Sequence, residues 1–190
     1  MSKVNGTALV TTLLLIVPSI AAAQHDMSPM GHEAKHELGV DVAIVYSKPS
    51  GGDGIIAIGT PVDVRLGFVS SGMLEVEPRF SFNFASGGGN NAYSFTPDIN
   101  LLFGLSADKN KKGPYVTVGA GVDLTHIKIS GLGSNSASQF SFNGGIGTRI
   151  PYESGAFRLE AFARYHLKNT SKGLPNTLDF GARIGLSLWH

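Results

Sequence analysis

Charged and apolar side chains alternate along this chain with a period of two residues. From position 74 to position 84 every even position is apolar, whereas the odd positions include Glu75, Glu77 and Arg79. Because successive side chains of a β-strand point to opposite faces, this segment predicts a strand with one apolar and one charged face. The chain is thereby limited to folds in which both faces find a suitable environment.

The same alternation recurs in further segments, which we also predict as strands. Together the predicted strands lie at about 37–46, 56–69, 73–84, 93–105, 115–127, 139–150, 157–167 and 177–189. Each reaches the roughly 9–11 residues that a tilted strand needs to cross a bilayer. The apolar face is too continuous for so small a core to cover, so lipid is its expected solvent. We therefore predict an all-β fold, an eight-stranded antiparallel up-and-down transmembrane β-barrel with its charges inside.

The first residues carry the pattern of a secretory signal. Lys3 precedes a mostly apolar run at 8–20, and the alanines that end at Ala23 provide a small-residue cleavage site, so we predict removal of residues 1–23. The rest is predicted as a leader over 24–36 and a barrel domain over 37–190, located in the bacterial outer membrane. The formal net charge of +1 gives no indication of a nucleic-acid partner.

The predicted connections form two alternating sets. The shorter set, on the predicted periplasmic side, comprises 70–72, 107–113 and 151–155. The longer set is richer in Gly, Ser and Asn, as expected of outer loops, and comprises 47–54, 85–92, 128–138 and 168–176. Three prolines lie inside predicted strands, where a missing N–H donor predicts a bulge or a local break in the ladder: Pro61, Pro78 and Pro97.

Charged residues of the predicted strands share the inward parity. On the lipid face a charge would cost roughly 2–4 kcal/mol at the bilayer midplane. The interior of an eight-stranded barrel is just wide enough for side chains, so we predict that these groups pair and fill the lumen. The predicted lumen network consists of Asp41, Asp63, Arg65, Glu75, Glu77, Arg79, Asp98, Asp123, Arg149, Arg158, Glu160, Arg164, Asp179 and Arg183. His166 is predicted to be a further inward polar residue near the rim.

Aromatic residues of the apolar face gather near both ends of the predicted strands. Such bands are typical of the two water–lipid interfaces of a membrane barrel. The predicted aromatic girdle consists of Tyr46, Phe68, Phe82, Phe84, Tyr93, Phe95, Phe103, Phe140, Phe142, Phe157 and Tyr165.

The leader carries imidazole and thioether side chains, which are ligands suited to copper. They are His25, Met27, Met30, His32 and His36. One interpretation is weak copper or zinc binding. The other, which we favour, is a polar leader before the first strand, because the spacing implies no fixed ligand geometry. No cofactor is predicted.

The chain resembles the small eight-stranded outer-membrane barrels of Gram-negative bacteria, the OmpA/OmpX-like group. The resemblance covers 37–190 and rests on the signal pattern, the amphipathic segments, the strand that begins Tyr115-Val-Thr-Val-Gly-Ala-Gly-Val, and the closing segment that ends in Leu188-Trp189-His190. It implies a monomer in outer-membrane lipid that is inserted by the outer-membrane assembly machinery. Members of the group usually end on the aromatic residue that this machinery reads, whereas here Trp189 is penultimate.

We therefore predict a barrel without enzymatic activity and with a structural, envelope or surface-interaction role, for which the sequence names no ligand. A first alternative is a narrow channel for ions or small solutes, whose selectivity would change in Arg79→Ala or Glu77→Ala. A second is a lipid-modifying enzyme around His126, although Lys128 stands where such enzymes carry a serine. A third is a soluble ligand-binding barrel of lipocalin type, which would require an apolar interior.

Overall fold

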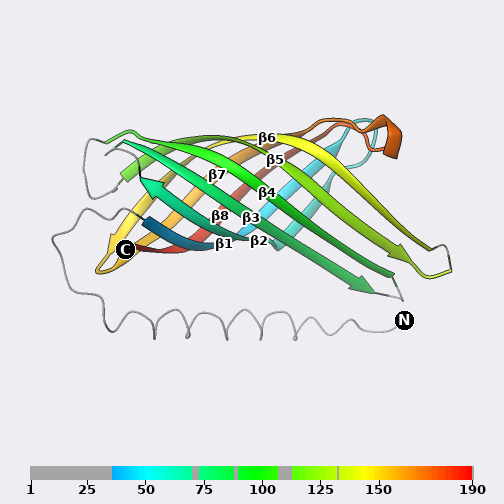
Figure 1. The fold of residues 1–190 in the computed structure, drawn as a ribbon, viewed down its shortest axis with the longest axis horizontal. Helices are drawn as coiled ribbons and strands as arrows, with labels where there is room; N and C mark the ends of the chain where they lie inside the picture. The colour runs from blue at the N-terminus through cyan, green and yellow to red at the C-terminus, as the bar shows by residue number, and fades with distance from the viewer. Residues whose placement is uncertain (1–35, 70–72, 88–89, 107–112, 132, 190) are drawn as a thin grey trace.

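The described part of the chain forms a closed antiparallel barrel in which each strand pairs with its sequence neighbours (Figure 1). The computed structural model describes residues 36–69, 73–87, 90–106, 113–131 and 133–189. The strands are β1 (His36–Pro49), β2 (Ile55–Val69), β3 (Leu74–Gly87), β4 (Asn90–Gly104), β5 (Gly113–Ile129), β6 (Gly133–Tyr152), β7 (Gly155–His166) and β8 (Thr177–Trp189), with a 3-10 turn, η2 (Thr170–Lys172), before β8. The predicted eight-stranded up-and-down barrel is confirmed. Across the described ranges no helix is long and apolar enough to cross a membrane.

Strands β1 and β8 close the barrel. Their register runs from Glu37↔Trp189 to Pro49↔Thr177. We call the end at which β1 begins and β8 ends the terminal end, and the opposite end, with the β7–β8 connection, the far end. In a closed barrel each strand has a hydrogen-bonded neighbour on both sides. Its backbone N–H and C=O groups therefore find partners within the wall, as a strand surrounded by lipid requires.

Side chains alternate between the two faces of this wall. In β1, Asp41 and Ala43 are buried, whereas Ile44 is 54% exposed. Apolar side chains on the outside are highly exposed, such as 75% for Ile58 and 65% for Ile146. The inside is mainly polar, and its apolar cluster consists of Ala43, Val45 and Phe162. The barrel is therefore apolar outside and charged inside, as the period-two pattern predicts.

The three prolines inside strands disturb the ladder, as predicted. At Pro61 the register of the β1–β2 ladder shifts. Beside Pro78 two consecutive pairs are missing from the β2–β3 ladder, and beside Pro97 two are missing from the β4–β5 ladder. Proline has no backbone N–H, so it cannot donate a hydrogen bond to a carbonyl of the neighbouring strand.

Two of the predicted far-end loops are wrong in extent. β3 and β4 remain paired up to Gly87↔Asn90, and β5 and β6 remain paired up to Ile129↔Gly133. Most of the predicted loops 85–92 and 128–138 is therefore strand. Gly, Ser and Asn carry no apolar alternation, so the pattern could not extend the strands into these segments. The two hairpins reach one corner of the far end, apart from the β7–β8 connection (Figure 1).

Candidate functional site: the charged lumen

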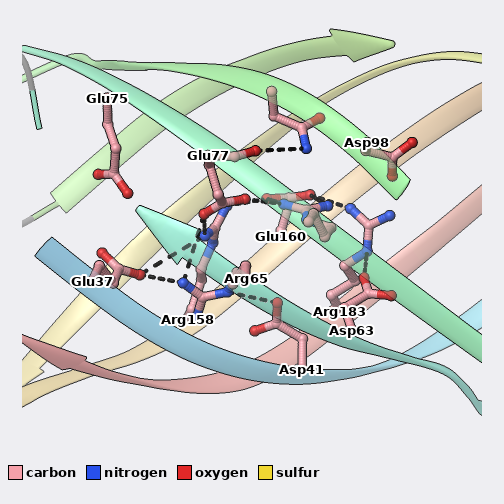
Figure 2. A network of polar contacts seen from close by, with 12 residues as sticks. Glu37, Asp41, Asp63, Arg65, Glu75, Glu77, Asp98, Arg158, Glu160 and Arg183 are labelled. Atoms are coloured by element: carbon pink, nitrogen blue, oxygen red, sulfur yellow. Dashed lines mark hydrogen bonds and ion pairs between the residues drawn. The ribbon is translucent and has the colours of Figure 1, made fainter. Parts of the chain in front are cut away.

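Acidic and arginine side chains fill the inside of the barrel. Arg65 and Arg79 are 0% exposed and Arg158 is 2% exposed. Each occupies an inward position of a strand whose neighbouring residues point outward. Figure 2 shows that side chains from several strands converge in the lumen, with contacts that connect Glu37, Arg65, Glu77, Arg158, Glu160 and Arg183.

Arg65 on β2 ties three strands together next to the closure of the barrel. Its Nε lies 2.7 Å from Asp41 Oδ2, and its guanidinium also forms an ion pair with Glu37, both on β1. Arg65 Nη2 donates to Ser187 Oγ on β8 at 2.8 Å, and the Ser187 hydroxyl donates to Glu37 Oε1 at 2.7 Å. Gly39 leaves room for this guanidinium, since a Cβ at Gly39 would lie 2.3 Å from Arg65 Cζ.

Glu77 on β3 and Glu160 on β7 bind the same two arginines from opposite walls. Glu77 Oε1 lies 2.7 Å from Arg79 Nη2, and Glu77 Oε2 forms an ion pair with Arg158. Glu160 Oε2 lies 2.8 Å from Arg158 Nη2, and Glu160 Oε1 lies 3.3 Å from Arg79 Nη1. Tyr115 on β5 donates its hydroxyl to Glu160 Oε2 at 2.9 Å. Because β3 and β7 lie opposite each other in the strand order, this group crosses the whole lumen.

Two further arginines extend the network along the barrel axis. Toward the terminal end, Arg149 Nη2 lies 2.9 Å from Glu75 Oε2. Toward the far end, Arg183 Nε lies 2.8 Å from Asp63 Oδ2, and the Arg183 guanidinium stacks 3.6 Å from the centre of the Phe162 ring. The network therefore occupies the lumen over several levels of side chains.

A separate cluster lies nearer the far end. His166, the last residue of β7, stands between Asp123 on β5 and Asp179 on β8, with Nδ1 2.7 Å from Asp123 Oδ2 and Nε2 2.8 Å from Asp179 Oδ2. Arg164 forms an ion pair with Asp98 and lies 3.7 Å from Asp123 Oδ1. This cluster links β4, β5, β7 and β8.

One group of lumen carboxylates has the spacing of a metal site. Oxygen atoms of Glu37, Glu75 and Glu77 lie within 4.8 Å of one another. Arg149 Nη2 lies 3.1 Å from Glu37 Oε2 and 2.9 Å from Glu75 Oε2, and Arg158 forms an ion pair with Glu77. Guanidinium groups at these distances oppose a cation, so we interpret the group as part of the salt-bridge network.

The predicted metal ligands of the leader lie almost entirely outside the described residues. His36 is described: it begins β1, is exposed, and packs edge-on against Phe68 with 5.6 Å between ring centres. The other four lie beyond the described ranges, namely His25, Met27, Met30 and His32. The predicted signal segment 1–23 also lies outside them.

Every residue of the predicted lumen network is buried except Asp179, which is half-buried. The sequence pattern did not single out Glu37, Tyr115 and Ser187, although all three have inward parity. Glu37 stands at the start of its strand, where few neighbours support the alternation. Tyr115 is an aromatic residue at an inward position of its strand, and this is the sequence signal for a role in the lumen.

The predicted girdle residues lie on the outside of the barrel. They are exposed to between 41% and 66%, except Phe95, which is half-buried and packs against Phe82 with 5.0 Å between ring centres. His126 also lies on this side and near the far end. Its Nδ1 lies 2.8 Å from Ser136 Oγ, and its ring stacks on Tyr93 at 4.9 Å. Ser136 comes from the neighbouring strand, so the sequence around His126 did not indicate it.

No family model matches this chain, and no curated protein matches it. Solved structures match it by fold. Ail, the attachment invasion locus protein of Yersinia pestis, superposes with a TM-score of 0.54 and 13% identity, over 84% of this chain and 100% of Ail. Neisserial surface protein A superposes with a TM-score of 0.57 and 10% identity, over 83% of this chain and 98% of that protein. The fold is that of the small outer-membrane barrels.

A further structure of Ail, in complex with the heparin analogue sucrose octasulfate, matches with a TM-score of 0.53 and 13% identity. At these identities the likeness concerns the fold.

Proposed function

We propose that the protein is an outer-membrane barrel whose lumen is closed by its salt-bridge network and whose far end serves a surface or envelope role. The apolar outside supports the membrane location, because a soluble protein rarely exposes an apolar surface of this extent. The single observation that carries the closed lumen is the bridge between opposite walls made by Glu77, Glu160, Arg79 and Arg158.

The first experiment tests the membrane barrel. The mature protein is extracted from outer membranes in detergent and run in SDS gels before and after boiling. A closed barrel resists cold SDS, so we expect the unheated protein to migrate differently from the boiled one. An unshifted protein found in the soluble periplasmic fraction would contradict the proposal and favour a soluble β-barrel.

The second experiment tests the closed lumen. The refolded protein is reconstituted in planar bilayers, where we expect no steady unitary currents. Glu153→Gln, at an exposed position outside the lumen network, is the matched control for variants of the network. Steady currents from the unmodified protein, with an ion selectivity that changes in Arg79→Ala and not in Glu153→Gln, would establish the narrow channel instead.

The far end offers a basic surface to partners. Lys48, Lys128, Lys168 and Lys172 are exposed there, with Asp53 as the acidic residue of the described far-end segments. An anionic partner fits this charge, and binding of a heparin analogue by Ail supports such a role for a barrel of this fold.

The orientation can be tested because the chain has no cysteine. Lys172→Cys at the far end is treated with a membrane-impermeant maleimide on intact cells, and Glu153→Cys at the terminal end serves as the control. We expect labelling of the first variant alone. The reverse result would place the terminal end outside and remove the far end as a surface for external partners.

A further inference from the structure

We propose that His166 is a pH-sensitive clamp at the far end of the lumen. As an imidazolium it holds Asp123 of β5 and Asp179 of β8 together, and as a neutral imidazole it releases one of them. This clamp is a property in addition to the proposed function. It requires neither a closed lumen nor a surface role of the far end.

The two contacts of His166 define the charge state that the folded barrel favours at this position. Nδ1 lies 2.7 Å from Asp123 Oδ2 and Nε2 lies 2.8 Å from Asp179 Oδ2. An ionised carboxylate is an acceptor only, and an imidazole carries an N–H on both nitrogens only when it is cationic. The neutral ring would therefore turn a lone pair toward one of the two carboxylates and lose that hydrogen bond.

The clamp lies where β7 leaves the backbone ladder. The β6–β7 ladder ends at Ser141↔His166. Asp123 and Asp179 come from β5 and β8, which are not neighbours in the strand order, so their connection runs through His166 across the lumen. Thr96 on β4 fixes Asp123 by donating its hydroxyl to Oδ1 at 2.8 Å. Loss of one contact therefore loosens a link between non-adjacent strands.

The charged residues around the His166 ring strengthen the effect of its deprotonation. β4 contributes Asp98, β5 contributes Asp123, β7 contributes Arg164, and β8 contributes Asp179. The inward residues of β6 at this level, Ser141 and Asn143, do not titrate. Arg164 and the cationic ring face Asp123, whereas Asp98 is also near Arg79 and Arg183. A neutral ring removes the positive charge that stands between Asp123 and Asp179. Deprotonation therefore adds repulsion between the aspartates to the lost hydrogen bond.

The rest of the described lumen lacks this sensitivity. Its other cross-links use arginines, which keep their charge at all physiological pH values. An imidazole is the side chain that changes charge between about pH 5 and about pH 8. The two aspartates favour the protonated ring and move its charge change toward higher pH, so the far-end cluster responds to pH on the alkaline side of this window.

The experiment compares the temperature at which the barrel loses its SDS-resistant gel form at about pH 5.5 and about pH 8.5. We expect the unmodified protein to unfold several degrees lower at the higher pH. His166→Gln should lose most of this difference, because glutamine does not titrate. His126→Gln is the matched control, since it removes a histidine at the same end that contacts a serine outside the lumen, and it should keep the difference.

A direct measurement does not depend on a variant that folds. ¹⁵N NMR of the imidazole nitrogens in the unmodified barrel should show both nitrogens of His166 protonated at about pH 6 and one protonated at high pH. A neutral ring at about pH 6 would overturn the clamp. So would a His166→Gln barrel that keeps the full pH dependence of the unmodified protein.

Discussion

Replacing Glu77 by glutamine removes one charge from the centre of the lumen network while keeping the shape of the side chain. Glu77 is 0% exposed, forms an ion pair with Arg158, and lies 2.7 Å from Arg79 Nη2 and 3.7 Å from Arg65 Nη1. In Glu77→Gln these three guanidinium groups share one carboxylate fewer. An amide oxygen can still accept a hydrogen bond, but it does not neutralise their charge.

The expected loss follows from what remains around the arginines. Removing one partner of a buried ion pair costs about 3–5 kcal/mol, because the other charge stays buried without compensation. Glu160 still lies 2.8 Å from Arg158 and 3.3 Å from Arg79, so neither guanidinium is left alone. We therefore expect a loss at the lower end of this range, about 3 kcal/mol in the free energy of unfolding.

The assay is equilibrium unfolding in urea of the barrel reconstituted in lipid or detergent, under conditions where folding is reversible. Glu153→Gln is the control, because its exposed carboxylate is not part of the lumen network, and we expect little change. A free energy of unfolding for Glu77→Gln that equals that of Glu153→Gln would refute the reasoning. It would mean that water already screens the charges of the lumen.

Two further changes test the packing of the wall. Gly185→Ala should destabilise the barrel, because its Cβ would lie 2.5 Å from the Val40 backbone carbonyl, whereas Gly104→Ala meets no atom closer than 3.7 Å. Urea unfolding of the two variants should separate them, and equal stability would contradict the close approach. Ile146→Lys places a charge on the apolar outside and should cost roughly 2–4 kcal/mol, and Ser138→Lys nearer the far end should cost less. Equal costs in lipid would contradict the assignment of the lipid-facing band.

The sequence predicts the wall of this barrel well because the pleat of a strand is a local property. Whether Arg79 points inward depends on its parity relative to Phe80, and no distant residue changes that. The same argument placed His166 inside and His126 outside. It is weakest where the alternation fades, at the start of β1 with Glu37 and in the Gly-, Ser- and Asn-rich ends of β3, β4 and β6.

The partners of each inward charge were decided by the tertiary structure. Glu77 and Glu160 lie on opposite walls, and Ser136 meets His126 through the register of two neighbouring strands. The parity of a residue indicates which face of the wall its side chain is on. Its position along the barrel axis depends on how all the strands are staggered. The sequence by itself therefore determined a charged interior and an apolar exterior. Only the closed ladder decided that the charges bridge the lumen and that an imidazole lies between two aspartates at its far end.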